Sequence, residues 1–189
     1  MKRYYKQSVA GFTLIEMLVV IALIGILAAI AGPSWQGWLT RQRITSAQAE
    51  ALSAMREAQS NARREKRLWQ ACFKDDDTRV AWAIFPVPSN ATGGLFNCGG
   101  VNAGSWRSMV DEDSDKITID AANTTLRASG AGTYQVQFRE KGLINGSLGK
   151  ITFASRRDPQ SATKRCVFVS TLLGAMRTAQ NNDCNAPND

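Results

Sequence analysis

The stretch that decides the fold is 11-GFTLIEMLVVIALIGILAAIAGP-33. From Phe12 to Ala31 it contains twenty residues, of which only Thr13 and Glu16 are polar. An α-helix of that length spans about 30 Å, which is the thickness of the hydrocarbon core of a bilayer. The pattern therefore predicts one membrane crossing.

The residues around this segment set its orientation. Positive charge keeps the adjacent end of a membrane helix in the cytoplasm. The cations that precede the segment, with no acid among them, are Lys2, Arg3 and Lys6. The residues after Pro33 are therefore predicted to lie outside the cytoplasm. A cleaved secretory signal peptide is the alternative, because Ala28, Ala29 and Ala31 can imitate its cleavage site. That alternative gives no reason for Glu16, since an acid in a membrane helix costs about 2.5–3.5 kcal/mol.

Glu16 can form an ion pair if the chain is cut between Gly11 and Phe12. The cut frees an α-amino group on Phe12, and in one helix this group and Glu16 lie near the same face. In a packed array of such helices, the Glu16 carboxylate of one subunit can neutralise the Phe12 amine of its neighbour. Such a buried pair favours one alignment of the subunits. The alternative is a carboxylate that merely reaches back to the lipid headgroups.

The same stretch resembles the class III signal of type IV pilins and pseudopilins. The residues that carry the resemblance are Gly11, Phe12, Glu16, Gly25 and Pro33, after a short basic leader. It implies that a prepilin peptidase removes residues 1–11, that Phe12 is N-methylated, and that Glu16 serves assembly. Residues 12–33 are then the transmembrane and assembly helix. The implied partners are the peptidase, the inner membrane, and other pilins or pseudopilins in a filament.

Residues 34–68 are predicted to continue as an amphipathic helix that docks on a sheet. Small and apolar residues recur every three or four positions, as on one face of a helix. They are Ile44, Ala47, Ala51, Met55, Ala58 and Ala62. Two helix breakers precede them. Gly25 is expected to weaken the helix, and Pro33, which lacks an amide donor, is expected to kink or locally melt it.

Residues 69–189 are predicted to form a β-rich globular domain. The predicted strands, separated by turn residues, are 80–87, 116–121, 124–129, 133–140, 149–155 and 164–174. Strict alternation in YQVQF, residues 134–138, predicts one buried and one wet face, and Asn145-Gly146 predicts a hairpin turn. Because the strands follow the helix, the predicted fold class is α+β, a long N-terminal helix packed on a small antiparallel sheet, as in pilins.

The composition of the chain excludes some classes of enzyme and metal site. The chain has 189 residues, a net charge of +7 and no histidine, which excludes His-dependent triads and His metal sites. No catalytic residue, metal or cofactor is predicted. The acidic runs 75–77 and 111–115 could attract calcium, but they lack EF-hand spacing and are interpreted as solvated loops.

The cysteines of the chain are predicted to form two disulfides, because an even count in an exported domain is typical of disulfides. They are Cys72, Cys98, Cys166 and Cys184. Of the three possible pairings, locality favours Cys72–Cys98 with Cys166–Cys184. Four reduced, buried thiols are the alternative.

The last third of the chain resembles the GspH/FimT pseudopilin family. The matching residues are Phe138, Gly142, Ile151, Phe153, Gly174 and Arg177. In members that bind DNA, the last strand ends in Gly-Arg-x-Arg, whereas this chain has Gly174-Ala175-Met176-Arg177. The sequence from Arg139 to Arg177 contains eight basic and two acidic residues. This local excess of +6 is expected to attract phosphates. Arg156, Arg157 and Arg177 are the candidate DNA contacts.

Together these patterns predict a minor pilin of a type IV pilus, a non-enzymatic subunit at or near the filament tip that supports pilus assembly. The first alternative is a minor pseudopilin of a type II secretion system. The second is a pilus-associated DNA-binding protein for DNA uptake. The expected location is the inner membrane, with the globular domain in the periplasm, and then an extracellular or periplasmic filament.

Overall fold

The computed structural model describes residues 11–88, 97–98 and 102–185, without the side chains of residues 30–34 and 103. The predicted leader therefore lies outside the described residues, apart from Gly11. The chain divides into two compact units, Met1–Leu39 and Thr40–Asp189.

One long helix, α1, spans Leu14–Glu65. Its backbone is helical through Gly25 and Pro33, so the local melting predicted at Pro33 is wrong. A proline removes one hydrogen bond from the ladder, and the helical backbone continues on both sides of Pro33. The helix ends where Lys66 adopts a left-handed conformation, with φ of 51°.

The apolar stripe predicted between Ile44 and Ala62 is confirmed. All six of its residues are fully buried, with an exposed fraction of 0%. Four of the six are alanines, and small side chains allow the helix to approach a sheet closely. This part of α1 therefore contributes the helical side of the hydrophobic core of the second unit.

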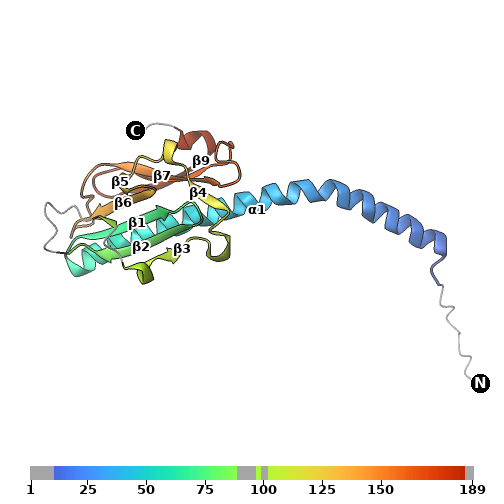
Figure 1. Ribbon diagram of the computed structural model, residues 1–189, viewed down its shortest axis with the longest axis horizontal. Coiled ribbons are helices and arrows are strands. Elements are labelled where there is room, and N and C mark those ends of the chain that lie inside the picture. The colour runs from blue at the N-terminus through green and yellow to red at the C-terminus, as the bar shows by residue number, and fades with distance from the viewer. Residues whose placement is uncertain (1–10, 89–96, 99–101, 186–189) are drawn as a thin grey trace, which may run out of the picture. The chain divides into compact units, whose positions relative to one another are not determined.

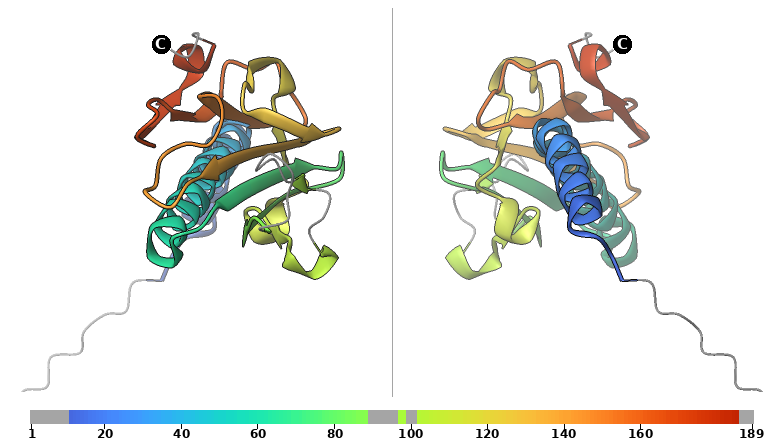
Figure 2. Two further views of the ribbon diagram at one scale, coloured as in Figure 1. Left: turned by 90° about the vertical axis from the view of Figure 1, so that its left-hand side faces the viewer. Right: turned by 90° about the vertical axis from the view of Figure 1, so that its right-hand side faces the viewer.

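The described residues of the second unit form two antiparallel sheets, which lie along one side of this part of α1 (Figures 1 and 2). Sheet A contains, in spatial order, β3 (Arg107–Ser108), β2 (Val80–Pro86), β1 (Trp69–Asp75), β6 (Thr133–Phe138) and β5 (Arg127–Gly130). Sheet B contains β4 (Ile117–Ile119), β7 (Gly149–Ser155), β8 (Arg165–Val169) and β9 (Met176–Gln180). Short 3₁₀ helices are η3 (Ala103–Ser105), η4 (Asp111–Asp113), η5 (Ala121–Asn123) and η6 (Asn181–Cys184).

A common core joins the helix to both sheets. The α1 stripe packs with Phe73 and Phe138 of sheet A and with Ile151 and Phe153 of sheet B, all of which are fully buried. The predicted α+β class, with a long N-terminal helix packed on antiparallel strands, is confirmed. The sequence patterns did not predict β1, β3 or β9.

The predicted wet face of β6 is wrong. Gln135 and Gln137 are only 2% and 3% exposed. The Gln137 amide donates to Gln70 Oε1 at 2.8 Å, and its own Oε1 accepts from the Asn145 amide at 2.9 Å. The chain reverses at residues 139–143, where Phe138 bridges to Ile144, and Asn145-Gly146 is a bend on the way from β6 in sheet A to β7 in sheet B. The predicted hairpin is therefore wrong, because this segment connects two different sheets.

Both disulfides pair the cysteines that are closer in sequence. Cys72 in β1 is bonded to Cys98, with Cα atoms 6.0 Å apart. Cys166 in β8 is bonded to Cys184 in η6, with Cα atoms 5.7 Å apart. These are the pairings that locality favours. The first links a central strand to the segment before β3, and the second holds the C-terminal residues on sheet B.

Candidate functional site

The first candidate site is the apolar segment between Phe12 and Leu27. Twelve large apolar side chains of this segment are 41–83% exposed. Exposed apolar surface on this scale marks a binding site or a membrane contact in a stable protein. The described residues of this segment form no buried core of their own.

The membrane crossing predicted from Phe12 to Ala31 is not confirmed. Over the residues that the structure describes, none of the helices combines the length and apolar character that a crossing requires.

The predicted cleavage site lies just before α1. Gly11, Phe12 and Thr13 are exposed and non-helical, which leaves the peptide bond between Gly11 and Phe12 accessible. The Glu16 amide donates to Thr13 Oγ1 at 3.3 Å, so Thr13 caps the first turn. Glu16 occupies the third helical position, where an acid favourably meets the positive end of the helix dipole. Phe12 itself precedes the helix, which corrects the expectation that Phe12 and Glu16 share one helical face.

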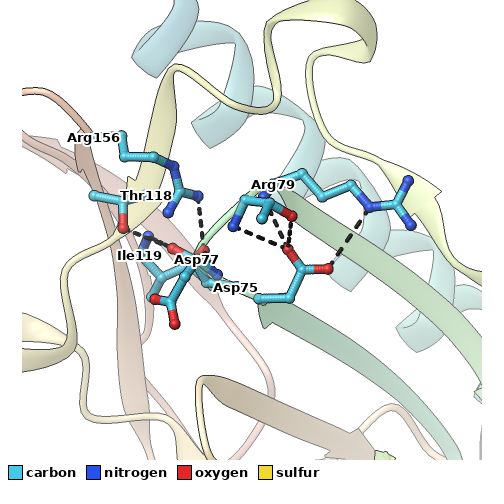
Figure 3. Close-up of polar contacts among 8 residues, drawn as sticks. Asp75, Asp77, Arg79, Thr118, Ile119 and Arg156 are labelled. Carbon is cyan, nitrogen blue, oxygen red and sulfur yellow. Dashed lines mark hydrogen bonds and ion pairs between the residues drawn. The ribbon is translucent and has the colours of Figure 1, made fainter.

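The second candidate site is the group of arginines expected to contact DNA, and Arg156 is engaged elsewhere. Its Nη2 atom lies 2.7 Å from Asp75 Oδ1, and the two side chains are 22% and 8% exposed. The other oxygen of Asp75 accepts from Thr118 Oγ1 at 2.6 Å and from the Ile119 amide at 2.9 Å (Figure 3). Asp75 thus joins the end of β1 to β4 and to the residue after β7. The Arg156 guanidinium is therefore engaged within the fold, and its predicted contact with DNA stays a prediction.

The acidic run 75–77 is also engaged within the fold. Asp76 accepts from the Thr78 hydroxyl at 2.6 Å and from the Arg79 amide at 2.9 Å. These hydrogen bonds lower the pKa of Asp76 to about 2, and the hydrogen bond from the Thr78 hydroxyl has the largest effect. In the described part of the chain, acidic and cysteine side chains do not gather in threes suited to a metal ion.

Arg177 lies at the far end of β7 from the loop that carries Arg157. The register pairs Arg177 with Phe168 and Phe168 with Lys150, the second residue of β7. The Arg177 guanidinium lies 4.1 Å from the Phe168 ring centre, in a cation–π contact. Arg157 is exposed beyond the last residue of β7. The length of the strand, about 20 Å, separates the two arginines, so the fold does not bring them together.

Two lysines from the basic window are buried. Lys164 Nζ lies 2.7 Å from Asp120 Oδ2, and both side chains are less than a tenth exposed. Burial raises the pKa of Asp120, but hydrogen bonds from Lys164 and Asn123 outweigh it and lower the pKa overall. Lys150 is 3% exposed, and its burial, with Arg177 nearby, lowers its pKa. The excess of +6 counted along the sequence therefore overstates the charge offered to a ligand.

Comparison with known proteins places the N-terminal segment in a described family. Residues 6–32 match the family described as "Prokaryotic N-terminal methylation motif". A fimbrial protein of Pseudomonas aeruginosa is 50% identical over 52 residues, which cover 28% of this chain and 33% of that protein. The type IV major fimbrial protein FimA of Dichelobacter nodosus is 36% identical over 92 residues, covering 49% of this chain and 54% of that protein. The match thus spans about a third to a half of these relatives.

Among solved structures, the type IV minor pilin FimU of Pseudomonas aeruginosa is similar with a TM-score of 0.46 and 12% sequence identity. The alignment covers 75% of this chain and 92% of that chain.

Proposed function

We propose that this type IV pilin-like protein is a minor pilin, a structural subunit that enters a pilus filament at or near its tip and supports assembly. The observation that carries the proposal is the exposed apolar segment from Phe12 to Leu27, which coincides with the methylation motif at residues 6–32. A segment of this kind needs a partner along its whole length, and a filament of like helices supplies one.

The processing step follows from the same residues. A prepilin peptidase would cut between Gly11 and Phe12, in backbone that is exposed and non-helical. The new amino group on Phe12 would then pair with Glu16 of a neighbouring subunit. Before assembly the precursor is anchored in the inner membrane, with its N-terminus in the cytoplasm and the unit Thr40–Asp189 in the periplasm.

A filament role is favoured over a role in type II secretion, because the relatives described above are fimbrial proteins. No enzymatic activity is proposed. The globular unit uses its buried charged residues, Asp75 with Arg156 and Asp120 with Lys164, to join its own elements.

The proposal is tested by expressing the full chain in a pilus-bearing bacterium and analysing purified filaments by mass spectrometry. The N-terminal peptide is expected to begin at Phe12 and to carry one N-methyl group. The subunit is expected to form a small fraction of the filament. A chain that begins at Met1 or near Gly32, or that is absent from filaments, would overturn the proposal.

A further inference from the structure

A hollow with basic walls lies where α1 ends and the β6–β7 loop, residues 139–148, turns back. Its volume is about 600 Å³. Arg67 and Leu68 line it from the segment after the helix, and Arg139 and Lys141 line it from the loop. None of the DNA contacts predicted from the sequence is among its residues.

The helix and the loop are locked together beside this hollow. Gln59 Nε2 donates to the carbonyl oxygens of Gly142, at 2.9 Å, and of Gly174, at 3.0 Å. Gly142 has φ of +76°, and a Cβ there would overlap the Arg63 guanidinium. The cations of the last helical turn are thereby held against those of the loop before any ligand arrives, and such preorganisation lowers the cost of binding.

The charges around the hollow are strongly unequal. We define the helix-end basic surface as Arg63, Arg64, Lys66, Arg67, Arg139 and Lys141, all of which are exposed. Two acids lie among them, Glu65 and Glu140, which leaves a net charge of +4. Glu65 already accepts from Arg67 at 2.9 Å and from the Trp69 indole at 3.2 Å.

The helix dipole accounts for only part of this surface. Cations in the last turn of a helix are favourable near its negative end, which explains Arg63 and Arg64. It does not explain Arg139 and Lys141, because they arrive from a different loop. Their convergence with the helix end points to an anionic ligand.

We propose that the helix-end basic surface binds the phosphate groups of a nucleic-acid backbone. Four of its six cations are arginines, whose planar guanidinium groups match phosphate geometry and form paired hydrogen bonds. A membrane surface is a poorer fit. Among the described residues, the large apolar side chains that are exposed lie in the segment 12–38 and at Leu172 and Leu173, and none belongs to this surface. The proposal does not depend on filament assembly.

The test uses the full chain in nonionic detergent and a labelled single-stranded oligonucleotide of about 30 nucleotides. Affinity is measured by fluorescence anisotropy at salt concentrations between about 50 and about 200 mM. The test variant is Arg67→Ala/Arg139→Ala/Lys141→Ala. The matched control is Arg157→Ala/Arg177→Ala, which removes exposed cations of sheet B and its loop.

The wild-type chain is expected to bind with an affinity that falls as salt rises. The test variant is expected to lose at least about tenfold in affinity, with a salt slope smaller by about 2, since each lost phosphate contact removes about 0.7. The control is expected to stay within about twofold of the wild type. Near-ultraviolet circular dichroism checks that both variants keep the fold.

Three results would overturn the proposal. The first is no binding at the lowest salt concentration. The second is a control that loses as much affinity as the test variant. The third is equal competition by polyglutamate at matched charge, which would mean that the surface attracts any polyanion and does not recognise phosphate.

Discussion

The two parts of helix α1 are both rich in apolar residues, yet they differ in where these side chains lie. From Ile44 to Ala62 the apolar residues form a stripe that is completely buried against the two sheets. From Leu14 to Leu27 they lie on all sides of the helix, and they are exposed. The later part is rich in small residues and packs on the sheets of its own unit, whereas the earlier part carries large side chains that belong to no buried core among the described residues.

Periodicity, more than total hydrophobicity, indicates where a helix is covered. A stripe that recurs every three or four residues faces one partner, and an apolar surface on all sides needs a surrounding one. Mutations in the two parts of the chain are therefore expected to have different consequences. Changes in the segment 12–29 are expected to affect assembly, and changes in the unit 40–189 are expected to affect stability.

The largest effect is expected for Glu16→Ala. Removing one member of a buried ion pair costs about 3–5 kcal/mol, so incorporation into filaments is expected to fall by well over about tenfold. Quantitative mass spectrometry of purified filaments measures it. Glu57→Ala, which removes an exposed acid from the later part of the same helix, is the control. Unimpaired incorporation of Glu16→Ala would mean that Glu16 has no partner in the filament and serves only the first turn of α1.

The next largest effect is expected for Lys164→Met, which leaves Asp120 buried without its cation. The free energy of unfolding is expected to fall by about 3–5 kcal/mol. Lys116→Met is the matched control, because it breaks an exposed pair with Asp115 and should cost less than about 1 kcal/mol. Urea unfolding of the full chain in detergent, followed by tryptophan fluorescence, measures both. Equal losses in the two variants would show that burial does not set the value of these pairs.

A smaller effect is expected for Gln59→Ala. The variant leaves the carbonyl oxygens of Gly142 and Gly174 without their donor, at a cost of about 1–3 kcal/mol. Hydrogen exchange should become faster in residues 139–145 and 170–175, while exchange in the segment 12–29 stays unchanged. Gln42→Ala, at an exposed position of the same helix, is the control. Unaltered exchange in both loops would mean that Gln59 does not hold them together.

The smallest effect concerns acid. The pKa of Asp76 is lowered to about 2 in the folded chain, chiefly by the Thr78 hydroxyl, so ionisation favours the fold. Its contribution is complete above about pH 4, the ordinary pKa of an unfolded aspartate, and it is lost as the pH falls toward about 2. Asp76→Asn is therefore expected to reduce the loss of stability between these pH values by less than about 1 kcal/mol. Urea unfolding at several pH values measures this difference, and parallel curves for the two proteins would contradict it.

How far the sequence predicts this protein depends on the distance between partners. The stripe from Ile44 to Ala62 is readable because its members are neighbours on one helix. The buried side of β6 is not, since Gln137 is covered by Gln70 and Asn145 from other segments. Local alternation cannot reveal such partners.

The candidate sites show the same limit. Gly11, Phe12 and Glu16 stand in one short motif, and the matched family covers them. The predicted role of Arg156 depended on its sequence neighbours, whereas its partner Asp75 is 81 residues away. The helix-end basic surface was missed for a related reason, because its cations come from residues 63–67 and 139–141, and counting charge along one window separates them.

The Cys166–Cys184 disulfide also determines how the last strand responds to force. β9 lies at the edge of sheet B, beside β8. A pull on the end of an antiparallel edge strand normally unzips its hydrogen bonds one after another. Here, tension applied beyond Cys184 passes through the covalent bond to Cys166 within β8, and β9 carries little load. The residues beyond Cys184 are therefore tethered covalently to an inner strand of sheet B, and a pull on them bypasses the hydrogen bonds between β8 and β9.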